Sequence, residues 1–213
     1  GEAEPESVVP TRTMRMALRS RMAVPVIISR RPASPAFGSF SVLYKTLTMH
    51  PLLNIAVGAA RSAGNLIMRH YDRVDELRVH TKQRNDFVTE VDRSAEARII
   101  EHIHRANPNH AILGEETGAS GDDEVVWIID PLDGTTNFLH QFPQFAVSIG
   151  IQVRGKLEHG VVYNPYSQER YTAWGGAGAA LDGRRIRVSR ANSLEGALIG
   201  TGFPFRDDQD VDG

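Results

Sequence analysis

The stretch VVWIIDPLDGTTN, residues 125–137, carries the most information about fold and chemistry in this chain. Its first five residues, 125–129, are apolar without interruption, which is typical of a short strand buried on both faces. Asp130 follows the strand directly, and Asp133 comes three positions later. A carboxylate at the mouth of a buried strand is costly unless positive charge meets it. The stretch therefore predicts a central strand that ends in an acidic binding site.

The spacing of the two carboxylates suits a divalent cation. Hard cations such as Mg²⁺ take carboxylate and carbonyl oxygens as ligands, and Leu132 contributes a carbonyl between Asp130 and Asp133. Pro131 fixes its own φ and so helps to direct the Leu132 carbonyl and the Asp133 side chain toward one point. The four residues from Asp130 to Asp133 thus form a candidate Mg²⁺-binding segment.

Groups that phosphate chemistry needs lie on either side of this segment. The amides of Gly134, Thr135 and Thr136 come where the chain enters a turn or short helix, and exposed amides there can receive a phosphate. Upstream, the acidic pair 115–116 follows a short apolar segment, 111–113, and so adds carboxylates at a second strand end. Two cations about 4 Å apart on such ligands can activate a water and neutralise a phosphoryl group. Taken singly, each acidic pair is more typical of a turn or a solvated loop, so the joint pattern carries the inference.

Helices are predicted before this stretch and strands around and after it. Residues 51–71 and about 92–106 carry apolar side chains at helical spacing, and Asn107-Pro108 ends the second helix. At the start of that helix, Asp92 alone is typical of a cap. Strands are expected at residues 111–113, 125–129, 145–153, 157–163 and 170–174. Helices followed by a run of strands favour an α+β fold, a layered α/β sandwich with helices packed on a mainly antiparallel sheet.

Composition limits the class of protein. The 213 residues include no cysteine, which excludes thiolate metal sites and cysteine nucleophiles. No apolar run approaches the roughly 20 residues of a membrane-spanning helix, so no membrane association and a cytoplasmic location are expected. Residues 49–213 hold 17 basic and 23 acidic side chains, a net charge of −6. Direct binding to nucleic acid is therefore not expected.

Residues 1–48 differ from the rest of the chain. They are rich in Arg, Ser and Pro, have no acidic residue after Glu6, and show no sustained periodicity. They are either a transit-like segment or sequence from upstream of the true start. We expect residues 1–48 to be an unstructured or non-native extension, and residues 49–213 to form the catalytic domain.

Four motifs together resemble the inositol monophosphatase family. They are DFVTEVD at 86–92, GEET at 114–117, WIIDPLDGTTNF at 127–138 and VSIG at 147–150. Their order and spacing are highly specific, and the similarity runs from about Met49 to the end of the chain. The segment after Met49 looks most like the bacterial extragenic-suppressor branch, which makes a start upstream of the true one the better explanation of residues 1–48.

The resemblance implies a fold of the sugar-phosphatase type and Mg²⁺-dependent, lithium-sensitive hydrolysis of an inositol phosphate by direct attack of water. It implies the following roles: Glu115, Asp130, Asp133 and the carbonyl of Leu132 hold the metals, with Asp130 bridging; Thr135, Glu115 and Asp92 orient the attacking water; Gly134, Thr135 and Asp133 meet the phosphate.

The family also places a further metal-binding aspartate in a later Trp-Asp-x-Ala-Ala-Gly segment, which does not occur before Gly213. We therefore expect an incomplete C-terminal part of the fold and a poorly active chain. A homodimer is implied by the resemblance alone.

Other functions remain open. A haloacid-dehalogenase type of phosphatase would have Asp-x-Asp-Gly-Thr, whereas two residues separate Asp130 from Asp133 here. Within the family, the substrate could instead be a sugar bisphosphate or a 3′-phosphonucleotide. The bacterial branch is also associated with transcription antitermination, so a protein contact with RNA polymerase or a Nus factor is an alternative role.

Overall fold

The computed structural model describes residues 49–77, 81–188 and 193–195. The predictions for residues 1–48 concern residues outside these ranges. The helices and strands below belong to one compact unit, whose described residues begin at Met49 and end at Ile186.

The two long helices lie at the start of this unit. They are α2 (Pro51–Tyr71) and α3 (Thr81–Ala106), joined by the short 3₁₀ helix η1 (Asp72–Leu77). Pro51 lies in the first turn of α2, where a missing N–H costs nothing. The His50 side chain caps the same end, because its Nδ1 accepts a hydrogen bond of 3.3 Å from the Leu52 amide. The prediction of the first helix is confirmed.

The predicted start of the second helix at about Asp92 is wrong, because α3 begins eleven residues earlier, at Thr81. Residues 81–91 are mostly polar, so they show little of the apolar periodicity on which the prediction depended. No glycine or proline interrupts residues 81–106, and nothing in the sequence therefore stops the helix from extending backwards.

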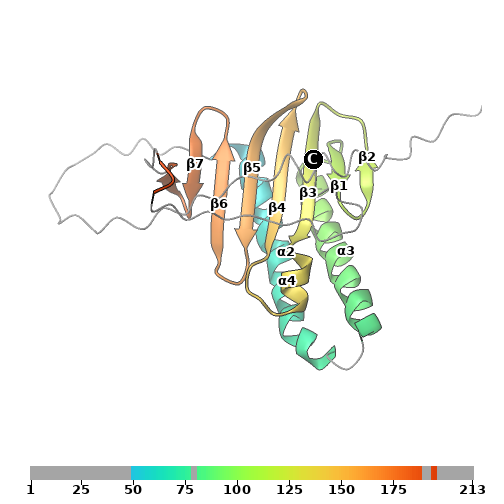
Figure 1. Cartoon of the computed structure of the whole chain (residues 1–213). Helices are drawn as coiled ribbons and strands as arrows, with labels where there is room; N and C mark the ends of the chain where they lie inside the picture. Colours follow the sequence, from blue (N-terminus) through green and yellow to red (C-terminus); the bar gives the residue numbers. More distant parts are fainter. Residues whose placement is uncertain (1–48, 78–80, 189–192, 196–213) are drawn as a thin grey trace, which may run out of the picture. The chain divides into compact units, whose positions relative to one another are not determined.

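A single eight-stranded sheet follows the helices (Figure 1). Its order is β2-β1-β3-β4-β5-β6-β7-β8. The strands are β1 (Ala111–Gly114), β2 (Gly118–Ser120), β3 (Val125–Asp133), β4 (Ala146–Val153), β5 (Lys156–Asn164), β6 (Glu169–Trp174), β7 (Gly178–Leu181) and β8 (Arg184–Ile186). β1 pairs with β3 in parallel, and every other neighbouring pair is antiparallel. The predicted α+β fold with a mainly antiparallel sheet is confirmed.

Three short strands were missed, and β3 extends four residues beyond its predicted end. β2, β7 and β8 have three or four residues each, too few to show an alternating pattern. β3 continues past its apolar run through Asp133, with a register shift against β4 between Asp130 and Asp133. A bulge of this kind redirects side chains and is common beside functional sites. The acidic segment is therefore a bulged extension of the central strand.

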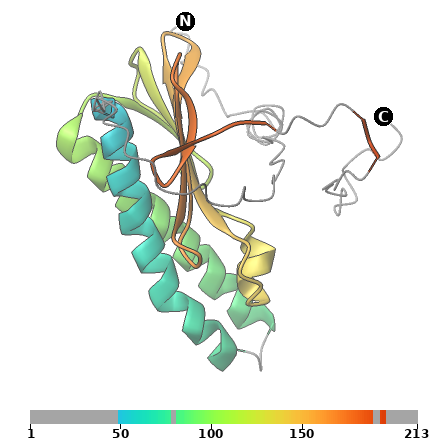
Figure 2. The ribbon, with the colours of Figure 1, turned by 90° about the vertical axis from the view of Figure 1, so that its left-hand side faces the viewer.

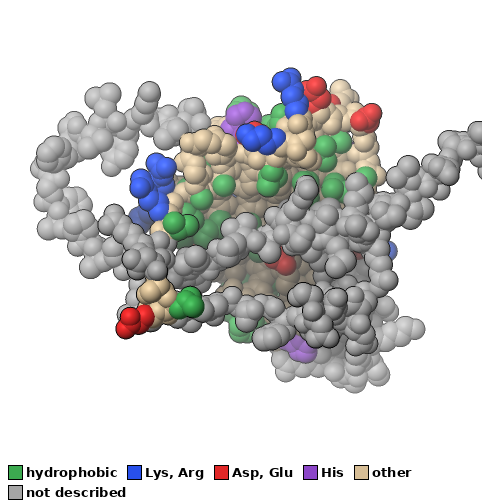
Figure 3. Space-filling view, turned by 45° about the horizontal axis from the view of Figure 1, so that its top comes forward, with side chains coloured by type: hydrophobic (Ala, Val, Ile, Leu, Met, Phe, Trp, Pro, Cys, Tyr) green, Lys and Arg blue, Asp and Glu red, His purple; other side chains and the backbone are tan. Residues whose placement is uncertain are grey.

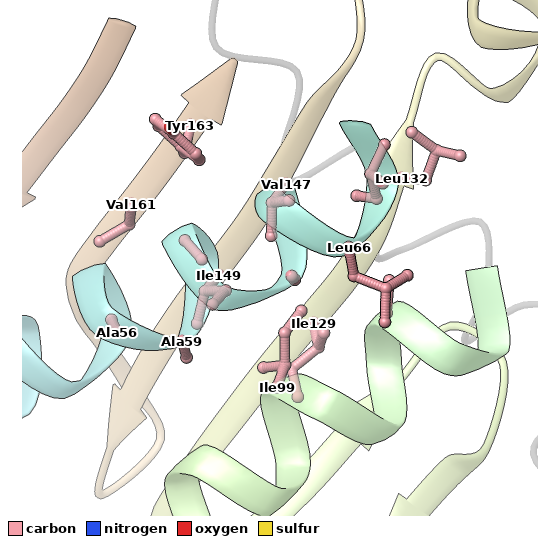
Figure 4. Close-up of a cluster of buried hydrophobic side chains, with 14 of the residues drawn as sticks. Ala56, Ala59, Leu66, Ile99, Ile129, Leu132, Val147, Ile149, Val161 and Tyr163 are labelled. Carbon is pink, nitrogen blue, oxygen red and sulfur yellow. The ribbon is translucent and has the colours of Figure 1, made fainter. Parts of the chain in front are cut away.

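Both helices lie on the same face of the sheet (Figure 2). Between helices and sheet lies the core, where apolar side chains of α2 and α3 meet those of β3, β4 and β5 (Figure 4). Ile99 from α3 and Ile129 from β3 are fully buried in it, as are Ala59 of α2 and Val147 of β4. Burying apolar area of this kind contributes roughly 25 cal/mol per Å². The core fixes β3 against α3, and thereby fixes the end of β3 that carries the acidic residues.

The opposite end of the sheet carries charged pairs. Arg154 lies 2.8 Å from Glu124, and Lys156 lies 2.8 Å from Glu158. Figure 3 is turned toward this end and shows basic and acidic side chains near one another along the rim. Such exposed pairs contribute little to stability. Within the described ranges, no helix combines the length and apolarity needed to cross a membrane.

Candidate active site

The acidic residues predicted from two separate motifs meet at one edge of the sheet. Because β1 and β3 run in parallel, with Gly114 opposite Ile129, the next residue of each segment, Glu115 and Asp130, lies beside the other. Glu115 begins the turn after β1, and its amide donates a hydrogen bond of 3.1 Å to the Ile129 carbonyl. Asp130 is the next residue of β3. The sheet topology thus brings Glu115 and Asp130 together.

Asp130 lies in an electrostatically unfavourable position. Burial raises its pKa to about 8, and the charges of Glu115, Asp133 and Asp92 contribute in the same direction, as does a side-chain hydrogen bond with Glu115. Its Oδ1 is buried and has no hydrogen-bond partner among the described residues. Two carboxyl groups that share a hydrogen bond must hold a proton between them unless a cation replaces it.

Asp92 reaches the same cluster from α3. The 26-residue helix contains Asp92 well inside its length, so Asp92 is not the helix cap that its residue type alone suggested. Its side chain is only 8% exposed. Burial raises its pKa to about 8, with further contributions from Glu116, Glu115 and Glu96. The cluster therefore draws on three elements: α3, the turn after β1 and the end of β3.

Directly after Asp133 the chain turns at Gly134 into α4 (Thr135–Leu139), which Figure 1 shows at the end of β3. Leu132 is buried, whereas Asp133 is exposed. The Thr135 hydroxyl donates a hydrogen bond of 3.0 Å to the Leu132 carbonyl. Its proton is thereby fixed, so the lone pairs of this oxygen can accept a hydrogen bond from another molecule.

Gly134 has the backbone conformation that makes this turn possible. Its φ is +87°, in the left-handed region, and it immediately precedes α4. A Cβ at this position would lie 2.8 Å from the carbonyl oxygen of Gln144. The Asn137 side chain donates a hydrogen bond of 2.6 Å to the same carbonyl, which holds the facing loop in place. Both the dihedral angle and the available space therefore require glycine.

Replacing Gly134 with alanine is expected to lower the free energy of unfolding by about 2–4 kcal/mol, since the left-handed conformation alone costs about 1–2 kcal/mol and the contact with Gln144 adds to it. The matched control is Gly155→Ala in the β4–β5 turn, where φ is +78° and nothing lies within 4 Å of the added Cβ. Urea unfolding of both variants isolates the cost of the contact. Equal losses for the two variants would contradict a sterically required glycine.

One buried acid of this region was missed from the sequence. Glu96 has no solvent exposure, and its carboxylate accepts hydrogen bonds from the amides of Glu116 at 2.9 Å and Thr117 at 2.8 Å. The sequence places Glu96 four positions after Asp92, one helical turn further along α3, but no local pattern indicates that it is buried.

The donor set fits a hard divalent cation. The groups are carboxylate and carbonyl oxygens. The buried Oδ1 of Asp130 has no hydrogen-bond partner among the described residues, and a cation could take that place. Among the described residues, however, no three acidic or histidine side chains already converge as the ligands of one ion. The carboxylates are neighbours whose side chains would have to close around a metal.

These features define an α+β protein with a carboxylate cluster at the joined ends of a parallel strand pair. The chain belongs to the inositol monophosphatase family, whose model matches residues 48–213. The resemblance inferred from the four sequence motifs is confirmed.

Individual relatives agree with this assignment. Over 165 residues, 76% of the chain, it is 58% identical to the Nus factor SuhB of Pseudomonas aeruginosa and covers 61% of that protein. The crystal structure of the extragenic suppressor protein SuhB from Bartonella henselae has a TM-score of 0.61 at 40% identity, with 68% of this chain and 57% of that chain covered. An inositol monophosphatase from Anabaena gives a TM-score of 0.58 at 39% identity, with 67% and 51% covered. The chain spans about three fifths of the length of the curated relatives it matches.

Proposed function

We propose that the protein is a Mg²⁺-dependent phosphatase that hydrolyses a phosphate monoester of inositol to inositol and phosphate. The observation that carries the proposal is the carboxylate cluster, in which the Asp130 carboxyl lies against Glu115 and its buried Oδ1 has no hydrogen-bond partner among the described residues. Membership of the inositol monophosphatase family supports phosphatase chemistry in general, and the Anabaena relative supports the choice of substrate.

Glu115, Asp130, Asp133 and the carbonyl of Leu132 would hold the metal, with Asp130 shared between two ions. Mg²⁺ bound there supplies positive charge for the phosphoryl group and for the leaving oxygen. The carboxylates contribute their negative charge only when ionised, so the raised pKa values of Asp130 and Asp92 bear directly on binding.

Thr135 would orient the attacking water together with Glu115 and Asp92. Because the Thr135 hydroxyl already donates to the Leu132 carbonyl, it can only accept a hydrogen bond from a water. Asp92 and Glu115 belong to the same electrostatic cluster, and their ionised carboxylates can accept a hydrogen bond from the second O–H of that water. The amides of Gly134 and Thr135 would receive the phosphate, since the first amides of a helix have no acceptor within it, and Asp133 would meet the phosphate from beside them.

The test is phosphate release from inositol 1-phosphate by the protein at its natural length, with and without Mg²⁺. Release that requires Mg²⁺ and stops with chelator supports the proposal, and inhibition by Li⁺ is then expected. Release from a sugar bisphosphate or a 3′-phosphonucleotide but not from inositol 1-phosphate would keep the phosphatase and change its substrate. No release from any of these by folded, Mg²⁺-loaded protein would overturn the proposal.

A second candidate function is a protein contact in transcription antitermination, favoured by the 58% identity to a protein named as a Nus factor. The net charge of −6 over residues 49–213 speaks for a protein partner rather than nucleic acid. For either role we propose a cytoplasmic location and a homodimer.

The variant Asp133→Asn separates these two roles. Asp133 is exposed at the end of β3, so the substitution leaves the core untouched while removing a proposed metal ligand. We expect phosphate release to fall at least about 10-fold, as for loss of a group that supports a metal, while capture of RNA polymerase or Nus factors is unchanged. Parallel loss of capture would mean that the two roles share this site.

A further inference from the structure

The turn that carries Glu115 is hydrogen-bonded to a buried carboxylate on α3. Glu96 lies on α3, has 0% exposure, and faces the turn formed by residues 115–117. Each carboxylate oxygen accepts one hydrogen bond: Oε2 from the Glu116 amide and Oε1 from the Thr117 amide. Charge-assisted hydrogen bonds of this length are about twice as strong as neutral ones.

All three amides of the turn therefore have a defined acceptor. The Glu115 amide donates to the Ile129 carbonyl of β3, and the next two amides donate to Glu96. The backbone of Glu115 is thus tied to the central strand on one side and to α3 on the other. A turn fixed at three successive amides leaves its first side chain little freedom of position.

Gly114 shows how closely the carboxylate approaches the turn. A Cβ on Gly114 would lie 2.6 Å from the carboxyl carbon and from both oxygens of Glu96, closer than real contacts allow. The backbone of the turn thus packs directly on the carboxylate. A fully buried charge is retained only where its hydrogen bonds compensate for the lost hydration.

We propose that Glu96 is a positioning residue, which holds the backbone of Glu115 so that its side chain can join Asp130 in binding a divalent cation. The inference rests on the proposed function, because it assigns to Glu96 the preorganisation of that metal site. The proposal assigns Glu96 to the turn and not to the ion, because both of its oxygens face the amides of residues 116 and 117.

Two substitutions of Glu96 distinguish the effect of its hydrogen bonds to the turn from the effect of its negative charge. Glu96→Gln keeps the shape but replaces one acceptor oxygen by an NH₂ group, which cannot accept from an amide. Glu96→Asp keeps the charge but shortens the side chain by one methylene, so it cannot reach both amides. Glu101→Gln is the matched control on the same helix, because Glu101 is exposed and pairs only with Arg98 and Arg105 among the described contacts.

The experiment measures Mn²⁺ binding by electron paramagnetic resonance, on the protein at its natural length, with circular dichroism and thermal unfolding in EDTA as folding checks. We expect Glu96→Gln and Glu96→Asp to raise the Mn²⁺ dissociation constant by about 10- to 100-fold, the usual effect of losing a group that supports a metal ligand. Glu101→Gln should bind Mn²⁺ as the unsubstituted protein does.

Normal Mn²⁺ affinity in a folded Glu96→Gln variant would overturn the proposal. So would normal affinity in Glu96→Asp, because charge rather than reach would then account for the role. If Glu96→Gln does not fold, Gly114→Ala provides the second test, since its methyl group displaces the carboxylate without changing its charge; unchanged affinity there overturns the proposal equally. Failure of the unsubstituted protein to bind Mn²⁺ would overturn the proposed function, and with it this inference, whereas equal binding by all variants would overturn the inference alone.

Discussion

Asp130→Asn is expected to reduce Mg²⁺-dependent phosphate release at least about 100-fold. Loss of a residue that only supports a metal ligand costs about 10- to 100-fold, and Asp130 is proposed as a ligand itself. The same substitution should make the metal-free protein more stable at pH 8, by about 1–3 kcal/mol, the ordinary range for one residue. Asparagine carries no charge into the cluster and can donate a hydrogen bond to Glu115, with which the carboxyl of Asp130 must otherwise share a proton. Opposite effects on activity and on stability are a signature of a site whose charges are arranged for a ligand.

The direction of the stability change depends on pH. The pKa of Asp130 is raised from 3.8 to about 8 in the folded protein. The folded state therefore binds more protons than the unfolded state between these values, and this contribution to stability is fully present below about pH 4 and lost as the pH rises through about 8. The gain from Asp130→Asn should accordingly be largest near pH 8 and vanish near pH 4.

Asp122→Asn is the control for Asp130→Asn. Asp122 is exposed in the segment before β3, so the substitution removes the same formal charge away from the cluster. Urea unfolding in EDTA and phosphate release with saturating Mg²⁺ are measured for both. Full activity in Asp130→Asn would remove Asp130 from the metal site, and a loss of stability at pH 8 would show that the metal-free cluster is not under electrostatic strain.

The carboxylate cluster was predictable from sequence because its residues lie in short motifs beside strong strand signals. The apolar run 125–129 identified the central strand, and the carboxylates that follow it and the segment 111–113 were expected at strand ends. That these ends meet depends on the parallel pairing of β1 with β3, which no local pattern reveals. A mainly antiparallel sheet would place most consecutive strand ends at opposite edges.

Two features were missed from the sequence because the residues concerned are polar: the true start of α3 and the burial of Glu96. The first ten residues of α3 are largely polar, so the helix was placed too late and Asp92 was interpreted as a cap. Glu96 was missed because a glutamate on a helix is normally solvated, whereas its burial depends on the turn after β1 packing onto α3. Both errors concern residues whose environment is created by distant parts of the chain.

The second large effect is expected in the linkage between metal binding and protons. In the metal-free protein both Asp130 and Asp92 have pKa values raised to about 8, by burial first and by neighbouring carboxylates second. A divalent cation held by Asp130 and its neighbours would favour the ionised form of every carboxylate in the cluster, including Asp92, so its binding would release the protons held below that pH. The apparent affinity for Mg²⁺ should therefore rise about tenfold per pH unit for each proton displaced, from pH 6 up to about pH 8, and level off above it.

Isothermal titration calorimetry at pH 7 in two buffers of different ionisation enthalpy measures the number of protons released. We expect about two protons per protein molecule saturated with Mg²⁺ in the unsubstituted chain, because two groups with pKa values of about 8 are both mostly protonated at pH 7, and about one in Asp92→Asn. This variant should still fold, because the substitution relieves the same charge repulsion. A flat affinity between pH 6 and pH 8 with no proton release would mean that the carboxylates are already ionised in the free protein. Release from the unsubstituted chain but not from the variant would instead assign the proton to Asp92, on the helix, and leave Asp130 permanently charged at the end of β3.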